Sequence, residues 1–443
     1  MAETLLSLGL DVGTTSTQLV LSKLIIENNA SSFSVPDMQI SQREVVYRSP
    51  VYFTPLLGEN LVDGDRIRRI VEQEFQSAGI SREELDTGAV IITGETSRKE
   101  NAGAVVKALS TFAGDFVVAT AGPHLESILA AKGSGADQYS QDTGKTVLHM
   151  DIGGGTTNLA LIRSGKIVAT GCMNIGGRLL KFDQNGKLIY RSPVLDQQND
   201  LQPGNAVDPA QIEDLCKTMA ELLEMAAGLR PTNHLFHHFC TAEAGNHWLP
   251  PQDVQEISFS GGVGECIEKR FSPLAFGDIG PSLGNAIGNS LLCKMPYRLG
   301  NEVIRATVIG AGSHATQLSG STVFYRNVQL PLKNLPVVEN IQSLSHLDVP
   351  GILALEGHGC SSYCQITRLA DEILSQWPHG PIYIALQADM AKALGHALAL
   401  RTGQERRILC LDRLKLSEGS YLDVGHPVHS ALPVVIKTLI LAQ

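Results

Sequence analysis

Two segments of this chain, far apart in the sequence, repeat one pattern of acidic, glycine, hydroxyl and apolar residues. LDVGTTSTQLVL at residues 10–21 and MDIGGGTTNLAL at residues 150–161 align without a gap. The alignment pairs Asp11 with Asp151, and in both segments a glycine follows two residues later. Because Asp and Gly are common in ordinary turns, one copy alone would indicate only a β-hairpin. Two matching copies predict two similar hairpins, one in each half of a duplicated fold.

The turn of each hairpin carries residue types suited to binding phosphate groups. Glycine leaves backbone N–H groups open to an anion because no side chain blocks its approach, and Ser and Thr hydroxyls add donors. We therefore expect a polyphosphate to bind between the two turns. The predicted phosphate-binding residues are Gly13, Thr14, Thr15 and Ser16 in the first turn and Gly153, Gly154, Gly155, Thr156 and Thr157 in the second.

Asp11 and Asp151 stand at the ends of the strands that lead into these turns. A carboxylate repels a bare phosphate, so its position there indicates a cation between the two anions. Mg²⁺ prefers oxygen ligands and keeps several of its waters. We expect Asp11 and Asp151 to bind one Mg²⁺–nucleotide from two sides, mostly through the waters of the ion. We also expect one of the two to orient a hydrolytic water. They are the predicted metal-binding and catalytic residues.

The composition favours a large globular protein. The 443 residues are 43% hydrophobic and 18% charged, enough for two or three domains with their own cores. A net charge of −10 without a basic stripe argues against a nucleic-acid-binding protein. The sequence contains no run of about 20 apolar residues, so no membrane span is predicted. The first residues also lack the basic region of a signal peptide. Eight dispersed cysteines suit a reducing compartment, so we expect a cytoplasmic protein.

Short β-branched runs alternate with longer helical segments, which is typical of the α/β class. One such helix is expected between an N-cap at Asp63 or Asp65 and a stop at Gly79. We expect three regions: two halves and an additional C-terminal α/β unit whose role the sequence does not indicate. Their predicted bounds are residues 1–141, 142–300 and 301–443.

The two motifs together resemble the phosphate motifs of the actin, Hsp70 and sugar-kinase superfamily of ATPases. That resemblance implies two RNase-H-like halves that close on ATP and Mg²⁺. Residues 123–136 lie where the superfamily has its first connecting helix, and residues 280–290 resemble the second. ISFSGGVGE at residues 257–265 resembles the strand and turn that pack against adenosine. The resemblance thus implies adenosine contacts from Gly261, Gly262 and Glu265.

Four further segments resemble a narrower family, the reactivating factors of ethanolamine ammonia-lyase. They are ITGETSRKENA at residues 92–102, TAGPHLESILAAKGSGA at 120–136, FGDIGPSLGNAIG at 276–288 and LPVVIKTLIL at 432–441. This resemblance extends over essentially the whole chain. It implies a chaperone-like protein that uses ATP to promote exchange of damaged cobalamin in ethanolamine ammonia-lyase for intact adenosylcobalamin.

Several properties follow from that resemblance alone. Cobalamin is handled by the partner enzyme rather than stably bound by this chain. The protein is expected in the cytoplasm, and association with a bacterial microcompartment and formation of a homodimer stay open. Two other function classes also stay open. One is a small-molecule kinase of the same superfamily, whose pocket and general base the sequence does not reveal; the other is a nucleotide-switched, actin-like scaffold.

The first connecting helix departs from the superfamily in one respect. Hsp70-like relatives carry a carboxylate just before the proline that begins this helix, whereas this chain has Gly122 before Pro123. Glu126 lies one turn inside the helix, where a side chain that points at the cleft stays open, although we expect an exposed or capping one. This departure is compatible with slow ATP hydrolysis, or with nucleotide binding without fast hydrolysis.

Other motifs have simpler interpretations. DTGKT at residues 142–146 lacks the first glycine of a Walker A motif and leads into a strand rather than a helix. We therefore reject the hypothesis of a Walker A motif. VIGAGSHA at residues 308–315 has Rossmann-like glycine spacing without the acid that should follow, which favours a tight turn, while a role beside the nucleotide or in domain closure stays open. The histidines of residues 234–239 and the His–Cys segment at 358–364 complete no zinc site, so we expect packing side chains and reduced thiols. The charged run at residues 96–102 is either a helix start or a partner surface.

Overall fold

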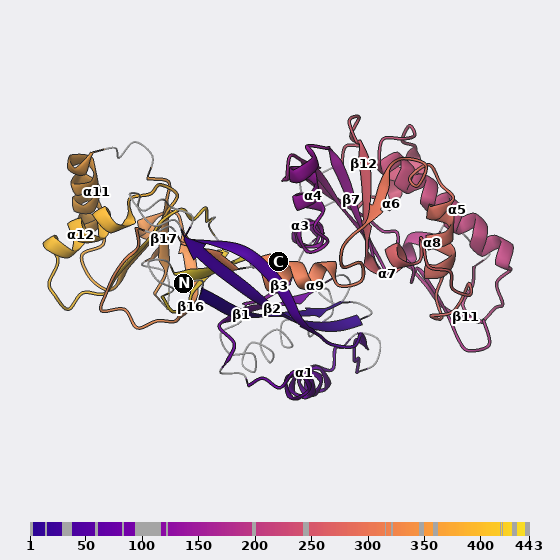
Figure 1. Ribbon diagram of the computed structural model, residues 1–443, viewed down its shortest axis with the longest axis horizontal. Helices are drawn as coiled ribbons and strands as arrows, with labels where there is room; N and C mark the ends of the chain where they lie inside the picture. Colours follow the sequence, from indigo (N-terminus) through magenta and orange to yellow (C-terminus); the bar gives the residue numbers. More distant parts are fainter. Residues whose placement is uncertain are drawn as a thin grey trace.

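Among the residues that the structure describes, the chain forms three larger sheets and one small hairpin sheet. The computed structural model places the sheet with β1 and β2 in the middle, the sheet with β7 and β12 on one side, and the C-terminal sheet with α11 and α12 on the other (Figure 1). The described residues are 3–13, 16–28, 38–57, 61–81, 84–93, 117–120, 123–196, 201–241, 248–314, 316–319, 322–344, 350–357, 362–416, 418, 420–427 and 432–438.

The first sheet has the strand order β3-β2-β1-β5-β6, with β4 paired to β2. β1 and β2 are antiparallel, as are β2 and β3, whereas β1, β5 and β6 run parallel. Alternate apolar side chains of β1 and β2 pack against the helix α1, which is capped by Asp63 and ended by Gly79 as predicted. The bounds are β1 (Glu3–Val12), β2 (Ser16–Asn28), β3 (Met38–Arg48), β4 (Tyr52–Phe53), α1 (Gly64–Ala78), β5 (Thr87–Ile92) and β6 (Val117–Thr120).

The second sheet repeats this topology. Its order is β9-β8-β7-β12-β13, with β7, β8 and β9 successively antiparallel and β7, β12 and β13 parallel. Position by position this matches β3-β2-β1-β5-β6, so the predicted duplication is confirmed at the level of strand order and direction. The bounds are β7 (Val147–Ile152), β8 (Thr157–Arg163), β9 (Lys166–Met173), β12 (Glu256–Ser260) and β13 (Tyr297–Leu299).

Both predicted hairpins form, and their turns close in the same way. The Gly13 N–H donates to the Ser16 carbonyl at 2.9 Å, and the Gly153 N–H donates to the Thr156 carbonyl at 2.9 Å. In the first hairpin Asp11 pairs across the strands with Gln18, and in the second Asp151 pairs with Asn158. The two acids therefore occupy equivalent places, as the alignment of the two segments predicts.

The second half carries an insertion between β9 and β12 that consists of a small hairpin and two helices. α5 supplies the larger part of its core, because one face of that helix buries a run of apolar side chains against the second sheet and α8. The elements are β10 (Leu180–Phe182), β11 (Leu188–Arg191), the 3-10 turn η3 (Pro193–Leu195), α5 (Pro209–Ala226) and α6 (His234–Phe239). After β12 come α7 (Gly261–Glu265) and α8 (Gly280–Gly288).

Two helices cross between the first and second sheets. α3 (Pro123–Gly133), followed by α4 (Ala136–Thr143), packs on β7, β8 and β9, whereas α9 (Ala306–His314) packs on β1, β2 and β5. A side-chain carbon on Gly133 would lie 1.8 Å from the Ala306 carbonyl oxygen, and one on Gly310 would lie 2.0 Å from that of Leu129. The helices cross at this separation because glycine lets their backbones touch.

This crossing corrects two sequence predictions. Residues 308–314 of the segment predicted as a tight turn lie instead in the helix α9, whose small residues fit against α3 and β1, and residue 315 lies outside the described residues. The helix that crosses α3 is α9, not the one predicted at residues 280–290. That helix, α8, packs on α5 and α7 inside the second half. The division of the chain at residues 141 and 300 stays a prediction, because both crossing helices lie between the sheets.

The C-terminal unit has the sheet order β14-β21-β20-β16-β17-β18-β19-β15. β16, β17, β18 and β19 are parallel, and α11 and α12 pack beside each other on them to form a separate apolar core. The bounds are β14 (Thr316–Leu318), β15 (Phe324–Arg326), β16 (Leu332–Val338), α10 (Ile341–Leu344), β17 (Ile352–Leu355), α11 (Tyr363–Gln376), β18 (Ile382–Leu386), α12 (Ala391–Arg401), β19 (Ile408–Leu411), β20 (Ser420–Val424) and β21 (Pro433–Thr438). Of the helices in the described ranges, none combines the length and apolarity that a membrane span requires.

Candidate functional site

The two hairpin turns open into one cavity of about 440 Å³ between the first and second halves. Both turns contribute, together with the carboxyl ends of β5 and β12, the first turn of α3 and the start of α9. Most of the residues predicted from the repeat line it. They are Asp11, Gly13, Ser16, Asp151, Gly153, Gly154, Gly155, Thr156, Gly261, Gly262 and Glu265.

Three of the predicted residues are not seen at the cavity. Thr14 and Thr15 lie outside the described residues. Thr157 is fully buried, and its hydroxyl donates to the Ile175 carbonyl at 2.8 Å. Because strand residues alternate between the two faces of a sheet, Thr156 and Thr157 cannot both face the cavity. Thr157 therefore fastens β8 to the loop after β9.

Asp11 lies at the end of β1 beside the end of β5. The Thr93 hydroxyl donates to Asp11 Oδ1 at 2.9 Å. Burial, together with the nearby carboxylates of Glu126 and Asp151, raises the pKa of Asp11 to about 8 even though the Thr93 hydrogen bond lowers it. Without a cation, Asp11 is therefore mostly protonated at neutral pH.

Asp151 occupies the equivalent place in the second half. The Ser260 hydroxyl donates to its Oδ1, and the Thr307 hydroxyl from α9 donates to its Oδ2 at 3.3 Å. Burial raises the pKa of Asp151. Behind it, His149 is fully buried among serine hydroxyls, and burial lowers its pKa to about 3, so this imidazole is neutral and holds the serine side chains in place.

Glu126 corrects a sequence prediction. It is 7% exposed, lines the cavity and accepts a hydrogen bond from Asn158 Nδ2 at 3.0 Å, so it is neither exposed nor a helix cap. The first turn of α3 faces the cavity because β8 and β9 cover one side of the helix and α9 another. The repeat contained a signal for the amide that binds Glu126. In both copies an amide residue follows the acid by seven positions, Gln18 after Asp11 and Asn158 after Asp151.

Arg178 brings a positive charge to the cavity. Its Nε donates to Asp278 Oδ2 at 3.1 Å, and its guanidinium lies 5.5 Å from the ring centroid of Phe53. Phe53 belongs to the first half and is 76% exposed, so this cation–π contact spans the two halves at the cavity. The sequence offered no signal for Arg178, since only the tertiary structure brings it opposite β4.

Close backbone contacts hold the loop before Arg178 against the second turn. The Gly177 N–H donates to the Gly153 carbonyl at 3.0 Å, and the Arg178 N–H donates to the Gly154 carbonyl at 2.6 Å. A side-chain carbon on Gly176 would lie 2.4 Å from the Gly154 oxygen. The Gly153 and Gly154 carbonyls of this turn thus bind the loop and fix its position against the turn.

The predicted adenosine turn also differs from expectation in form. Gly261 to Glu265 is a short helix, α7, that begins directly after β12. Gly261 has a φ of +87°, and a side-chain carbon on it would lie 2.2 Å from the Ile152 carbonyl oxygen, so glycine is required on both counts. The close approach sets α7 against the end of β7, next to Asp151.

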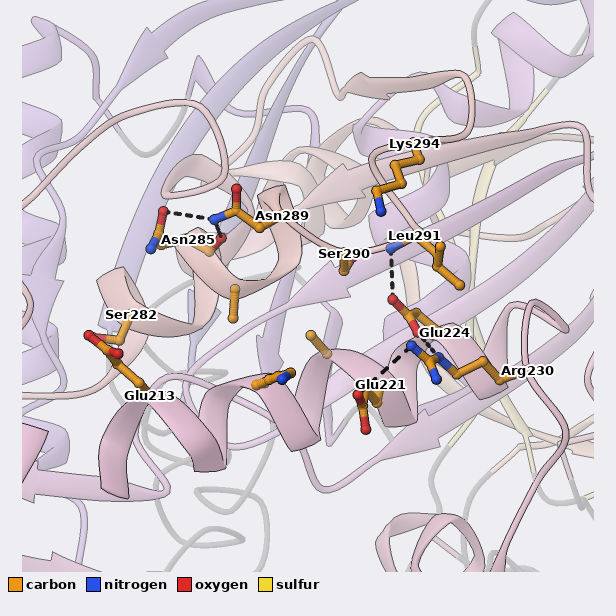
Figure 2. Close-up of a pocket in the computed structure, with 13 residues that line it drawn as sticks. Glu213, Glu221, Glu224, Arg230, Ser282, Asn285, Asn289, Ser290, Leu291 and Lys294 are labelled. Atoms are coloured by element: carbon orange, nitrogen blue, oxygen red, sulfur yellow. Dashed lines mark hydrogen bonds and ion pairs between the residues drawn. The ribbon is translucent and has the colours of Figure 1, made fainter. Parts of the chain in front are cut away.

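A second pocket lies between α5 and α8 (Figure 2). Within it Glu224 accepts a hydrogen bond from the Leu291 N–H at 2.7 Å and forms an ion pair with Arg230. Figure 2 shows Glu221 and Arg230 on the same side, with Asn285 and Asn289 on the opposite wall. Of the residues predicted from the repeat that the structure describes, none lines this pocket. The predicted site residues that line a pocket therefore converge on the cavity between the halves.

The cavity combines groups that can hold a polyphosphate with a cation. Its described lining includes glycines of both turns, the hydroxyl residues Ser16, Thr156 and Thr307, the Arg178 guanidinium and several carboxyl groups, of which Glu126 and Asp151 lie near enough to Asp11 to raise its pKa. Among the described residues, no group of three or more His, Cys, Asp or Glu side chains forms a metal cluster. Asp11, Asp151 and Glu126 thus need waters or ligand oxygens to complete a cation's coordination.

Comparison with known proteins extends over the whole chain. The family described as "Ethanolamine utilisation protein EutA" matches residues 3–349 and 344–442. The curated protein "Ethanolamine ammonia-lyase reactivase EutA" of Escherichia coli K12 is 37% identical over 98% of both chains. The protein of the same name from Salmonella typhimurium LT2 is 36% identical over 98% of both.

Among solved structures, the ethanolamine utilization protein EutJ from Carboxydothermus hydrogenoformans aligns with 69% of this chain and 88% of its own. The identity is 16% and the TM-score 0.35. The assignment therefore rests on the sequence matches, which run from the first sheet through the cavity residues to the C-terminal unit. On these matches, the chain belongs to the EutA family of ethanolamine utilisation proteins.

Proposed function

We propose that this protein is an ATP-dependent reactivase of ethanolamine ammonia-lyase. In this role it promotes release of damaged cobalamin from the lyase so that intact adenosylcobalamin can bind, and it holds no cobalamin itself. The observation that carries the proposal is that two equivalent acid-and-glycine turns line one cavity in a chain of the EutA family. We place the protein in the cytoplasm with the lyase, in contact with a bacterial microcompartment, and propose that it forms a homodimer.

The charge of the cavity supports a nucleotide bound together with a divalent cation. Among the described residues, its lining includes one guanidinium, that of Arg178, and five carboxyl groups: Asp11, Glu126, Asp151, Glu265 and Asp278. A triphosphate entering without a cation would be repelled by those of these carboxyl groups that are ionised. We propose that Asp11 and Asp151 hold Mg²⁺, mostly through its waters. When bound, the ion neutralises phosphate charge and activates water for hydrolysis.

The remaining lining divides between the phosphates and the nucleoside. We propose that the N–H groups of Gly154 and Gly155 and the hydroxyls of Ser16 and Thr156 bind phosphate oxygens, while Gly13 and Gly153, whose N–H groups close the turns, leave space for the phosphates because they carry no side chain. Glu265 at the end of α7, with Gly261 and Gly262 at its start, binds the adenosine. Asn158 holds the Glu126 carboxylate towards the cavity at 3.0 Å, where it can accept a proton from the attacking water.

The crossing of α3 and α9 supplies a route from the cavity to the C-terminal unit. α9 lies between the sheets of both halves and carries Thr307, whose hydroxyl donates a hydrogen bond to Asp151. The helix ends at His314, two residues before β14, the first strand of the C-terminal sheet. Closure of the two halves on a nucleotide is therefore expected to move α9, and with it the strand β14 of the C-terminal sheet. We propose that this coupling alters the contact with the lyase.

A reactivation assay tests the proposal. Ethanolamine ammonia-lyase is inactivated with an inert cobalamin and then incubated with this protein, ATP, Mg²⁺ and adenosylcobalamin. We expect lyase activity to return only when the protein and ATP are both present. No recovery would refute the proposal, phosphate transfer to an added metabolite would instead support a kinase, and nucleotide-dependent polymers alone would support a scaffold.

Proton release on nucleotide binding follows from the raised pKa of Asp11. Because that pKa is about 8 without a cation, the carboxyl is mostly protonated at pH 7.5 and must lose its proton when Mg²⁺ binds. We expect Mg²⁺–ATP binding to release up to about one proton at pH 7.5 and close to none at pH 9.5. Calorimetric titration in buffers of different ionisation enthalpy measures this number. Equal release at both pH values would contradict the assignment.

Replacement of Arg178 by glutamine should weaken nucleotide binding without unfolding the protein. The change removes the guanidinium and leaves the Asp278 carboxyl group beside the phosphates without its ion-pair partner. We expect the Kd for Mg²⁺–ATP to rise by about 10- to 100-fold, since a charge-assisted hydrogen bond contributes about 1.5–3 kcal/mol. Arg163→Gln is the matched control, because Arg163 pairs with Asp253 on the surface of the same half. A similar loss of affinity in both variants would contradict a role for Arg178 at the site.

A further inference from the structure

A second group of oxygen ligands lies in the C-terminal unit, well separated in the sequence from the nucleotide cavity. Asp389 follows β18 by three residues, and Asp412 follows β19 directly, so both stand at the carboxyl ends of neighbouring parallel strands. Thr322 lies just before β15, which pairs antiparallel with β19 through Phe324 and Cys410. That register brings Thr322 alongside Asp412. In open parallel sheets this edge is where ligands bind.

The contacts in this group leave more oxygens than protons. The Thr322 hydroxyl lies 2.9 Å from Asp389 Oδ1 and also contacts Asp412 Oδ2. A hydroxyl has one proton, so it can donate to only one of these carboxylates at a time. The two carboxyl groups also adjoin each other, since each affects the charge of the other. When both carboxyl groups are ionised, three oxygen-bearing side chains therefore converge with a single hydroxyl proton among them.

Asp412 has an oxygen without a partner. The residue is fully buried, and its Oδ1 accepts no hydrogen bond from any described residue. A buried carboxylate oxygen without a donor costs about 1–3 kcal/mol or more, so native structures rarely keep one without a bound ion or water. The Arg413 guanidinium donates to Asp389 Oδ2 at 2.8 Å, and its charge lowers the pKa of Asp412, which burial raises, but it donates no hydrogen bond to Asp412 Oδ1. Asp412 Oδ1 is thus the oxygen of this group that a bound cation would satisfy.

We propose that Thr322, Asp389 and Asp412 form a binding site for a hard divalent cation such as Mg²⁺ or Ca²⁺, separate from the nucleotide site. All three side chains offer oxygen, which these ions prefer, and no thiol or imidazole belongs to the group. Asp389 is 39% exposed, so water can reach the site and fill the remaining coordination positions. Three protein ligands with several waters is a common arrangement for such ions.

The site has a structural consequence for the C-terminal unit. A cation held there ties the end of β18 to the end of β19 and to the segment that leads into β15, three elements at one edge of this sheet. Removal of the cation restores the repulsion between Asp389 and Asp412. We therefore expect bound cation to stabilise this unit, independently of ATP.

Mn²⁺ binding to the full-length protein tests the proposal without nucleotide. Electron paramagnetic resonance counts bound Mn²⁺ in an Asp11→Asn background, which removes the proposed metal ligand of the other site. We expect one bound Mn²⁺ in this background, and a Kd raised at least about tenfold in Asp412→Asn and in Asp389→Asn. The cation should also raise the Tm of the background protein and lose that effect in both variants.

The controls keep each outcome decisive. Asp371→Asn removes a carboxylate that pairs with Arg401 on the surface of the same unit, and it should leave Mn²⁺ binding unchanged. If Asp412→Asn fails to fold, Asp389→Asn still tests the site, because Asp389 is partly exposed. Absence of a bound Mn²⁺ in the background protein, or equal affinity in all three variants, would overturn the proposal.

Discussion

Asp11→Asn is expected to abolish the nucleotide effect while leaving the fold at least as stable as in the wild type. An amide cannot supply the negative charge that Mg²⁺ requires, so the affinity for Mg²⁺–ATP should fall by about 100-fold or more. ATP-dependent recovery of lyase activity should drop to the level seen without ATP. Isothermal titration and the reactivation assay measure the two effects.

Above about pH 4 the same variant should be more stable than the wild type, although it binds nucleotide more weakly. The pKa of Asp11 is raised from 3.8 to about 8, so between these values the unfolded chain is ionised at this position while the folded protein keeps the proton. Rising pH therefore destabilises the wild-type fold across this window, and the loss is complete above about pH 8. Asparagine does not titrate, so the variant should gain on the order of 1–3 kcal/mol at pH 8 relative to wild type.

Urea denaturation of both proteins at pH 5 and pH 8, without Mg²⁺ or nucleotide, measures that difference. Asp253→Asn is the matched control, because the pKa of Asp253 is lowered by its hydrogen bond to Arg163, the reverse of Asp11. The control should keep nucleotide binding. A variant Asp11→Asn that still binds Mg²⁺–ATP with wild-type affinity would contradict the proposed metal site.

The second large effect is expected at the crossing of α3 and α9. Gly133→Ala places a carbon 1.8 Å from the Ala306 carbonyl oxygen, a backbone atom that cannot move without separating the two helices. In an unobstructed helix the same change would stabilise by about 1 kcal/mol. Here overpacking should cost about 3 kcal/mol or more, measured as the free energy of unfolding in urea. Gly310→Ala should behave in the same way, because it meets the Leu129 carbonyl oxygen at 2.0 Å.

Gly403→Ala is the control for this effect, since nothing lies within 4 Å of the added carbon. We expect it to change stability by no more than about 0.5 kcal/mol. If Gly133→Ala were as stable as this control, the helices would not touch as the structure has them. If it folded but lost ATP-dependent reactivation, the crossing would be the route that couples the cavity to the C-terminal unit.

Local chemistry was enough to predict the hairpins and the first helix. The match between residues 10–21 and 150–161 predicts equivalent turns, because Asp, Gly and a hydroxyl residue dictate the same closing hydrogen bond in both. The helix α1 also follows from its caps, since Asp63 accepts from the Arg66 N–H and Gly79 adopts the left-handed conformation. These features depend on residues close together in the chain.

Predictions that depend on distant contacts were less successful. The small residues of α9 predict a turn when the sequence is considered alone. They are small because α3 and β1 pack closely against α9, and this packing cannot be inferred from the residues of α9 themselves. Glu126 was expected to be exposed, because nothing in its own helix reveals that β8 and β9 cover the neighbouring side. Thr157 was expected at the phosphates, although strand alternation turns it to the interior.

The sequence by itself determined the duplicated hairpins, the two acids and the glycine turns, because the conformation of a turn depends on the few residues within it. Only the tertiary structure decided that Asp11 and Asp151 share one cavity with Glu126 and Arg178. It also decided that Thr322, Asp389 and Asp412 meet at one sheet edge. Both groups arise from the packing of elements remote in sequence, and the pKa of Asp11 follows from burial and neighbouring charges that exist only in the folded chain.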